Sequence, residues 1–568
     1  MRHSSLLICW LSMLSRLGLG AAAPIQNVMM AGAGGSKGAV ASESFICSRI
    51  GVNMIEMGGT AADAMVATEL CVGVIGMYHS GIGGGGFMLV RDKNGRYETI
   101  DYRESAPAAA HRDMYKDDPK SSVTGALSVA IPGELRGLEY LHKKYGVLPW
   151  RTLVGPSVRI ARNGFEVTED LVRYMKAASQ TSAFLTKDSI WAEDFAPNGT
   201  LVKLGDVITR KRFADSLEKI ANKGADEFYE GELANSMIDY IQSLNGTMTL
   251  DDLKNYTVKI KQPLSISYRD YRLFTTSAPS SGAVMLSILK TMEQYPSADL
   301  QNVNLTTHRF VEAMKFAYGA RQELGDPDYI GNITEYQEQM MSDDKAKETR
   351  KLIMDNQTQP IEVYDPLSLY AVDSKGTSHI VTADRSGLTV STTTTINLLF
   401  GAQIMTPDTG IILNDEMDDF SQPGRRNSFG FEPSPANFIA PGKRPLSSIT
   451  PLMVDHAGNG TLFFATGAAG GSRIISATTE VAWNLMELGM SIHDAIAAPR
   501  LHDQLMPDML LLEEEFDENV LLSLKEKKHN VTMMAPGASA AQGIVRLWDG
   551  RFDAAGETRQ KNSAGLVV

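Results

Sequence analysis

Residues 376–395 read GTSHIVTADRSGLTVSTTTT, and this stretch decides the fold. Two runs rich in Thr, Val and Ile flank an Asp-Arg-Ser-Gly segment at 384–387, which has the Asp and Gly of a type I turn. The pattern predicts an antiparallel hairpin whose register places residues 393–395, to within one position, beside Thr377. The expected strands are 377–383 and 388–395.

Helical and strand patterns alternate on both sides of this hairpin. Gly59-Thr60-Ala-Ala-Asp63 is a capping box with apolar residues at helical spacing behind it, and a similar apolar stripe covers 310–317. The chain has no repeat, low-complexity tract or Pro/Ser-rich linker that would mark a domain boundary. Strands enclosed by helices predict an α/β sandwich. Further strands are expected at 452–454 and 462–466, and further helices at 476–488 and 491–498.

The N-terminus has the three parts of a secretory signal: Arg2, an apolar run from Leu6 to Leu14, and Ala21-Ala22-Ala23. We therefore expect residues 1–23 to be removed. The apolar run falls short of the roughly 20 residues that span a bilayer, although an uncleaved membrane anchor remains the alternative. A secreted, extracellular protein is the expectation, with a cell-surface one second.

The composition narrows the class of partner. A net charge of −13 and a pI of about 5.4 argue against nucleic-acid binding, which needs an excess of Lys and Arg. Small molecules are the expected partners. Eight Asn-x-Ser/Thr sequons support the secretory route as glycosylation candidates. They are Asn198, Asn245, Asn255, Asn304, Asn332, Asn356, Asn459 and Asn530.

Only two cysteines remain once the signal, which holds Cys9, is set aside. Cys47 and Cys71 are compatible with one disulfide in an oxidising compartment, or with two buried free thiols. Neither has the spacing of a metal site, so we expect no catalytic metal.

Two familiar motifs are absent or out of place. Residues 81–86 contain the letters of a dinucleotide-binding fingerprint, but a helix precedes them and a strand follows, which is the reverse of the required order. A tight turn is the better interpretation. No G-x-S-x-G nucleophile elbow occurs at a plausible strand-to-helix turn. His379 shares a strand face with Thr377, but a lone histidine there is interpreted as a packing or hydrogen-bonding residue.

Several segments are unremarkable singly and specific together. The acidic stretch 414–420 is by composition a solvated loop, and 445–448 and 467–471 are turns. In order and number, however, the segments resemble the gamma-glutamyltransferase family of N-terminal-nucleophile hydrolases from about residue 38 to the C-terminus. The matching segments are 79–85, 102–104, 376–379, 394–397, 414–420, 445–448 and 467–471.

The resemblance implies a four-layer αββα sandwich of the α+β type, built by both parts of a self-cleaved precursor. Cleavage between Gly376 and Thr377 would leave a large subunit, 24–376, and a small subunit, 377–568, held together without a covalent link. Thr377 would be the nucleophile. Its hydroxyl is weak until the liberated α-amine can accept its proton, directly or through water.

The resemblance also assigns roles around Thr377. Thr395 would hydrogen-bond the nucleophile, and the backbone N–H groups of Gly470 and Gly471 would form an oxyanion hole. A gamma-glutamyl group ends in an α-carboxylate and an α-ammonium, which need opposite partners. By similarity the carboxylate would be held by Arg103, Ser447 and Ser448. The ammonium would be held by Asn397, Glu416 and Asp419.

The implied reaction is attack on the gamma-amide of glutathione or a related donor, followed by transfer of the gamma-glutamyl group to water, an amino acid or a dipeptide, without a cofactor. An inactive secreted homologue acting as a binding protein, or an acylase of the same fold, are the alternatives. The chain lacks the second large-subunit disulfide that animal relatives commonly have, so only a Cys47–Cys71 bridge can be carried over.

Overall fold

The predicted hairpin forms the centre of a seven-stranded antiparallel sheet. The computed structural model describes residues 35–370, 376–427 and 430–568, so the expected signal, 1–23, lies outside the described residues. Strands β10 (Gly376–Asp384) and β11 (Thr389–Asn397) are buried along their whole length. They pair as predicted, with Ser378 opposite Thr394.

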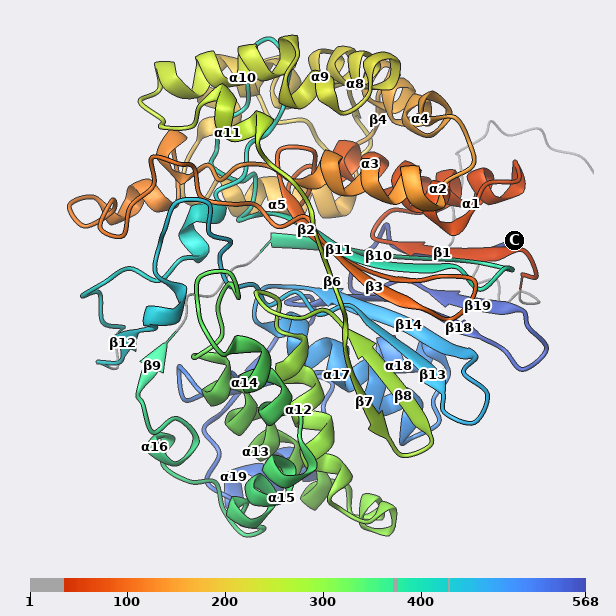
Figure 1. Cartoon of the computed structure of the whole chain (residues 1–568), viewed down its shortest axis with the longest axis vertical. Coiled ribbons are helices and arrows are strands. Elements are labelled where there is room, and N and C mark those ends of the chain that lie inside the picture. Colours follow the sequence, from red (N-terminus) through yellow and green to blue (C-terminus); the bar gives the residue numbers. More distant parts are fainter. Residues whose placement is uncertain (1–34, 371–375, 428–429) are drawn as a thin grey trace, which may run out of the picture. The chain divides into compact units, whose positions relative to one another are not determined.

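The first sheet combines strands from both ends of the chain (Figure 1). Its order is β20, β1, β10, β11, β2, β3, β6, and every pairing is antiparallel. The strands beside the hairpin are β20 (Ala564–Val567), β1 (Gly38–Ser42), β2 (Gly85–Arg91), β3 (Tyr97–Asp101) and β6 (Lys259–Lys261).

A second antiparallel sheet of six strands packs against the first. Val381 and Ala383 of β10 meet Met453 and Ala465 between the sheets, while Ile380 points to the helices on the other side, as the two-residue period of a strand requires. The order is β19 (Phe552–Ala555), β18 (Ala540–Arg546), β14 (Leu462–Ala469), β13 (Leu452–His456), β8 (Tyr271–Thr275) and β7 (Leu264–Tyr268).

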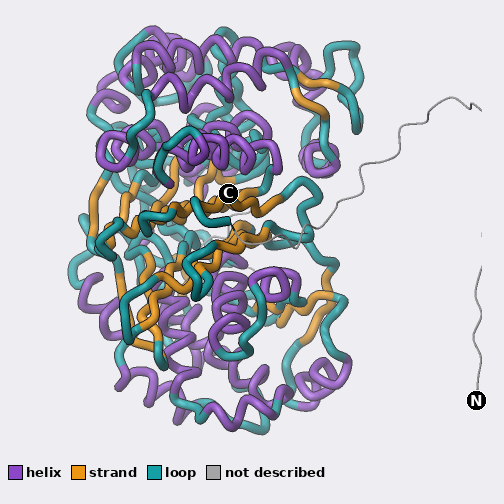
Figure 2. The backbone as a smooth tube through the Cα atoms, turned by 90° about the vertical axis from the view of Figure 1, so that its right-hand side faces the viewer, coloured by secondary structure: helices purple, strands orange, loops and turns teal. Residues whose placement is uncertain are grey.

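Helices cover the outer face of each sheet, which completes the αββα sandwich (Figures 1 and 2). Those over the first sheet include α1 (Phe45–Glu56), α2 (Ala61–Ile75), α3 (Glu134–Tyr145), α4 (Trp150–Asn163), α5 (Glu169–Ala178), α8 (Lys211–Lys223) and α10 (Glu232–Ser243). Those over the second are α12 (Gly282–Glu293), α13 (Val303–Arg321), α14 (Ile333–Met340), α15 (Asp343–Leu352), α17 (Arg473–Met486), α18 (Ile492–Ala497) and α19 (Glu518–Glu526).

Shorter elements lie in the connections. The short helices are α6 (Phe184–Lys187), α7 (Ser189–Phe195), α9 (Asp226–Tyr229), α11 (Leu250–Lys254) and α16 (Ile361–Tyr364). The small sheets pair β4 (Phe165–Glu166) with β5 (Val207–Ile208), β9 (Leu369–Tyr370) with β12 (Glu432–Pro433), and β16 (Leu510–Glu513) with β15 (Leu501–His502) and β17 (Val531–Met534).

Local predictions agree with these elements. Thr60 and Asp63 form the expected capping box at the start of α2. A disulfide joins Cys47 on α1 to Cys71 on α2, which decides between the two interpretations of these cysteines. The glycine loop follows α2 and leads into β2, so it is a turn as predicted. No helix among the described residues is long and apolar enough to cross a membrane. Seven of the eight sequon asparagines are exposed, and Asn304 is half-buried.

Candidate active site

Thr377 lies at the start of β10, and its side chain is buried against the second sheet. The residue is 4% exposed, and the pairing of β10 with β11 is irregular between Gly376 and Ser378. Such an irregularity re-aims a side chain without ending the strand. The backbone N–H of Gly470 donates to the Thr377 hydroxyl at 2.9 Å. The nucleophile and one proposed oxyanion donor are therefore in contact.

Thr395 lies beside Thr377, as the hairpin predicts, but its hydrogen bond differs from the expected one. In this uncleaved chain the Thr395 hydroxyl donates to the carbonyl oxygen of Gly376 at 2.5 Å and accepts from the backbone N–H of Asn397 at 2.7 Å. It therefore contacts the peptide bond that precedes the nucleophile, rather than the hydroxyl of Thr377. This carbonyl belongs to the bond that self-cleavage would break.

Gly470 and Gly471 connect β14 to the start of α17. Their φ angles are 128° and 64°, in the region that favours glycine. A Cβ atom on Gly470 would also come within 2.6 Å of the carbonyl oxygen of Ala538. Glycine is thus required at 470 by both conformation and space, and its N–H is held toward Thr377.

Arg103 is the centre of a buried charge cluster. It follows β3, is 1% exposed, and its guanidinium bonds Glu416 and Asp419. Those two acids lie three residues apart in a single 3₁₀ turn, residues 416–419, where side chains at that spacing share a face. By the family resemblance, Arg103 and the acids are expected to bind opposite charges of a substrate. In the structure these groups bind one another.

Burial and mutual repulsion shift the pKa values of the acids around Arg103. Burial raises the pKa of Asp419 to about 6, although the Arg103 charge opposes the shift. Burial raises the pKa of Glu416 further above its ordinary value, and that of Glu104, 3.7 Å from Arg103, to about 8. Glu104 has no role among the residues expected from the sequence. Burial lowers the pKa of Arg103, but the attraction of Glu416 and Asp419 outweighs this and raises it.

Several buried acceptor atoms in this region have no hydrogen-bond partner among the described residues, including both carboxylate oxygens of Glu104 and Oδ2 of Asp415. Two more are Oδ1 of Asn397 and Oε2 of Glu416. Both of these side chains are buried, at 0% and 1% exposure. The Nδ2 group of Asn397 donates to the carbonyl oxygen of Asp415 at 3.0 Å, which fixes the amide. Because a buried unpaired acceptor costs about 1–3 kcal/mol, these atoms indicate a site for a donor from outside the chain.

Ser447 and Ser448 lie beside a cation that sequence reasoning missed. Arg321, on α13, donates to the hydroxyl of Ser448 at 3.0 Å and to that of Ser281 at 3.0 Å. Ser281 in turn donates to the carbonyl oxygen of Ser447 at 2.6 Å. The positive charge of Arg321 also opposes the rise that burial causes in the pKa of Asp419. A single arginine at the end of a helix gives no sequence signal for this role.

The predicted residues therefore form one continuous site. Hydrogen bonds run from Gly470 to Thr377, from the preceding Gly376 to Thr395 and on to Asn397, and from Asn397 to the acidic loop that holds Arg103. The backbone carbonyl groups of Pro445 and Leu446 accept from Arg103, which brings in the serine pair. Chemically, the site offers a hydroxyl nucleophile, an N–H donor for an oxyanion, and charges of both signs.

His379 stays outside this chemistry, as predicted. Its ring is buried between the sheets, where Nδ1 is 2.8 Å from the hydroxyl of Thr393. Burial lowers its pKa to about 3, so the ring is neutral. Gly467 faces it: a Cβ there would lie 2.3 Å from the imidazole. His379 is therefore a packing residue, and its ring leaves room only for glycine at position 467.

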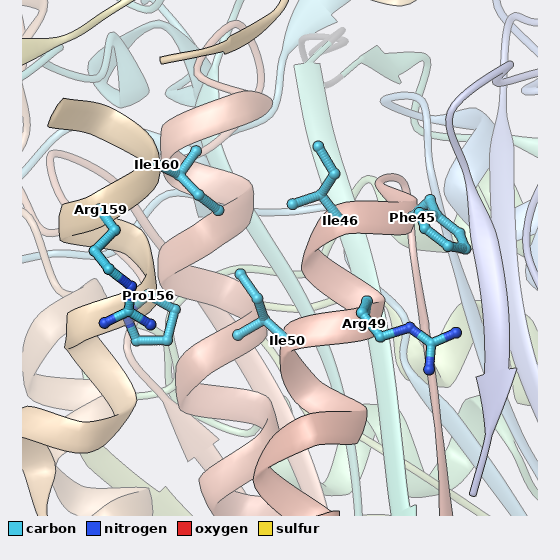
Figure 3. Close-up of a pocket in the computed structure, with 7 residues that line it drawn as sticks. All are labelled: Phe45, Ile46, Arg49, Ile50, Pro156, Arg159 and Ile160. Atoms are coloured by element: carbon cyan, nitrogen blue, oxygen red, sulfur yellow. The ribbon is translucent and has the colours of Figure 1, made fainter. Parts of the chain in front are cut away.

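A surface pocket lies between α1 and α4, outside this site (Figure 3). Its volume is about 290 Å³, and it is lined by four aliphatic or aromatic side chains, a proline and two arginines. It contains no hydroxyl, amide or carboxylate side chain and none of the predicted residues. The candidate chemistry lies instead where the central strand β10 begins.

Comparisons with known proteins place this geometry in context. A profile of the family described as Gamma-glutamyltranspeptidase matches residues 47–567. A glutathione hydrolase proenzyme of Arthroderma benhamiae is 52% identical over 94% of this chain and 93% of its own length. A glutathione hydrolase of Aspergillus flavus is 46% identical over 94% of this chain and 89% of its own length.

Solved structures agree with the fold. The gamma-glutamyltranspeptidase of Helicobacter pylori is 30% identical with a TM-score of 0.54, covering 60% of this chain and 96% of the crystallised one. A cephalosporin acylase from Bacillus halodurans is 24% identical with a TM-score of 0.82, covering 96% and 99%. At that identity the acylase shows the fold alone.

Proposed function

The chain belongs to the gamma-glutamyltranspeptidase family, and we propose that Thr377 carries its reaction, the cleavage of gamma-glutamyl amide bonds. The protein is an enzyme of the gamma-glutamyltransferase and glutathione hydrolase type. The observation that carries the assignment of the site is the pair of unpartnered buried acceptors, Asn397 Oδ1 and Glu416 Oε2, beside Arg103.

Donor recognition follows from these charges. The α-ammonium of a gamma-glutamyl donor would satisfy Asn397 Oδ1 and the carboxylates of Glu416 and Asp419. The guanidinium of Arg103 and the hydroxyl groups of Ser447 and Ser448 would bind the α-carboxylate. Pairing both charges offsets a desolvation cost of several kcal/mol, which a donor without either charge could not do. This supports glutathione, its conjugates and related gamma-glutamyl compounds as donors.

The reaction then proceeds through an ester. The hydroxyl oxygen of Thr377 attacks the gamma-carbonyl carbon, and its proton passes to the α-amine of Thr377, directly or through water. The N–H groups of Gly470 and Gly471 stabilise the oxyanion, a contribution of about 3 kcal/mol per donor. The C–N bond breaks, and the leaving amine, cysteinylglycine for glutathione, takes the proton. Water or the amine of an amino acid or dipeptide then takes the gamma-glutamyl group from the ester.

Maturation would use the same atoms. The hydroxyl oxygen of Thr377 attacks the carbonyl carbon of Gly376, which the Thr395 hydroxyl polarises from 2.5 Å. The peptide C–N bond breaks as an ester forms, and the hydroxyl proton passes to the nitrogen, which becomes the free α-amine of Thr377. Water then hydrolyses the ester to a carboxylate on Gly376 and restores the Thr377 hydroxyl. The products are the large subunit, 24–376, and the small subunit, 377–568. This supplies the base that the later reaction needs.

The Thr377→Ala variant tests the assignment. Purified protein of the natural sequence is expected to give two bands on a denaturing gel, with the smaller one beginning at Thr377, and to release aniline from a gamma-glutamyl anilide. The variant is expected to stay as one band and to release none, because both reactions need the same hydroxyl. Turnover by the variant would show that the nucleophile is misassigned.

A secreted location is part of the proposal. Its support is the N-terminal signal pattern, the Cys47–Cys71 disulfide and the exposure of most sequon asparagines. Glycosidase treatment is expected to lower the apparent mass of the secreted protein on a denaturing gel. A cell-surface anchor would instead leave the protein in the membrane fraction.

A further inference from the structure

Three potential metal ligands meet far from the cleavage chemistry, in the helical layer over the second sheet. His308 and Glu312 lie one turn apart on α13, and His529 follows the end of α19. All three are buried, at 0%, 0% and 4% exposure. One ligand atom from each lies within 4.8 Å of the other two.

Neighbouring groups aim two of these ligands at one point. Nε2 of His308 is 2.8 Å from the carbonyl oxygen of Met354, so it carries the proton and leaves the Nδ1 lone pair facing the cluster. The Tyr364 hydroxyl donates to Oε2 of Glu312 at 2.7 Å, which leaves Oε1 facing the same point. Outer partners of this kind, a carbonyl on imidazole and a hydroxyl on carboxylate, are typical of metal centres.

The hydrogen bonding within the cluster is incomplete. Nε2 of His529 is 2.8 Å from Nδ1 of His308 and shares a proton with it. The same Nε2 is 4.0 Å from Oε1 of Glu312, which has no partner among the described residues. The histidine pair thus satisfies itself but leaves a buried carboxylate oxygen directed at it. Such an oxygen calls for a cation.

We propose that His308, Glu312 and His529 bind one divalent transition-metal ion of the zinc class. The ligands would be His308 Nδ1, His529 Nε2 and Glu312 Oε1, with water in the fourth position. Two imidazole nitrogens favour zinc, cobalt or nickel over calcium and magnesium, which take oxygen ligands. When the ion binds, the shared proton moves to Nδ1 of His529, which forms no hydrogen bond with the described residues.

The charged groups around the cluster are paired with one another. Lys315, on the same helix as His308 and Glu312, forms ion pairs with Asp503 at 3.6 Å and Asp508 at 3.5 Å. Lys527, Arg309 and Asp355 also act electrostatically on His308, and Arg309 donates to both carboxylate oxygens of Asp355.

The position of the ligands gives the site a role. His308 and Glu312 precede the Gly376–Thr377 bond, and His529 follows it. If the chain is cleaved there as proposed, the metal would join the two subunits. Metal binding itself does not depend on cleavage, so the uncleaved Thr377→Ala variant should bind the ion equally well. That variant separates a failure of this inference from a failure of the proposed function.

Metal titration of the full chain tests the site. After treatment with a chelator, the protein is expected to bind one equivalent of Zn²⁺, with a melting temperature that rises until one equivalent is present. Co²⁺ is expected to give the visible absorption of a low-coordinate nitrogen and oxygen site. X-ray absorption of the zinc-loaded protein should show two imidazole ligands at about 2.0–2.1 Å. None of these readouts uses activity or a variant.

Variants then assign the ligands. Glu312→Gln and His529→Gln keep side-chain size and are expected to weaken Zn²⁺ binding at least tenfold. His493→Gln, which changes an exposed histidine paired with Asp553, is the matched control and should keep the full equivalent. The proposal is overturned if the folded natural protein binds no Zn²⁺, or if the X-ray absorption spectrum of the zinc-loaded protein shows no imidazole ligands. It is also overturned if folded Glu312→Gln and His529→Gln bind Zn²⁺ as tightly as the control.

Discussion

Arg321 shows how one residue can prepare a site without touching the bond that breaks. Its guanidinium donates to Ser448, so that hydroxyl already has a donor and its own proton must point elsewhere. That proton would be donated to the α-carboxylate of the donor in the proposed binding mode. Through Ser281, Arg321 also holds the backbone carbonyl of Ser447. Arg321 is therefore a positioning residue for both serines.

Replacing Arg321 by methionine should weaken recognition of the carboxylate. Hydrogen bonds to charged groups contribute about 1.5–3 kcal/mol, so kcat/KM for a gamma-glutamyl anilide should fall roughly 10- to 100-fold. With the 4-aminobutanoyl anilide, which lacks the α-carboxylate, kcat/KM of the same variant should be within about twofold of the value for the natural enzyme. Arg321→Lys should restore part of the loss. An equal fall with both anilides would contradict the role, since it would indicate general structural damage.

At the residue scale, sequence reasoning found the groups that carry patterns and missed those that do not. Thr377, Thr395 and the glycine pair sit in recognisable segments and were predicted. Arg321 stands in an ordinary helix, and Glu104 was quoted only as part of a motif. The mutual pairing of Arg103 with Glu416 and Asp419 was also not predicted, because the sequence cannot tell whether opposite charges bind a ligand or each other.

At the scale of elements, the 3₁₀ turn at 416–419 gathers acids around Arg103 more densely than one cation can neutralise. Burial raises the pKa of Asp419 to about 6, against an ordinary value of 3.8. Because this folded pKa is raised, the carboxylate form prevails only above about pH 6, and the group takes up a proton as the pH falls through that value. The attraction for an ammonium group is lost in the same window.

Binding of free glutamate should report this titration. Glutamate carries the same α-ammonium and α-carboxylate, and both keep their charges between pH 5 and pH 8. As a competitive inhibitor it should have a Ki that rises toward tenfold per unit as the pH falls below 6. Inhibition constants are used because kcat also depends on the α-amine of Thr377. A Ki that is flat down to pH 5 would show that Asp419 does not titrate there.

The first sheet contains one strand pairing that the local sequence pattern predicts and others that it does not. β10 and β11 are adjacent in sequence, rich in β-branched residues and joined by a turn, so their register followed from the sequence. β1 and β20 are short Gly- and Ala-containing strands at opposite ends of the chain. Their pairing with each other, and that of β1 with β10, depends on tertiary packing, which no local signal reports.

At the scale of the whole molecule, the two proposed subunits share both sheets. In the first sheet β1, from the large subunit, lies between β20 and β10, from the small one, and β2 continues the sheet beyond β11. In the second, β13 of the small subunit pairs with β8 of the large one. The disulfide lies within the large subunit, so it does not hold the halves together. The halves are held together by backbone pairing between their strands and by the core between the sheets.

The cleaved halves should therefore co-elute as one particle in gel filtration, under non-reducing and reducing conditions alike, and separate only when both unfold. A chain that begins at Thr377 and is made alone would expose the edge of β10 that β1 covers and the edge of β11 that β2 covers. Such unpaired edges promote aggregation, so this chain should be insoluble or lack native circular dichroism. Adding the large subunit during refolding should rescue it. A small subunit that folds alone into a soluble monomer with the native spectrum would refute the shared sandwich, because its strands would not need those of the large subunit.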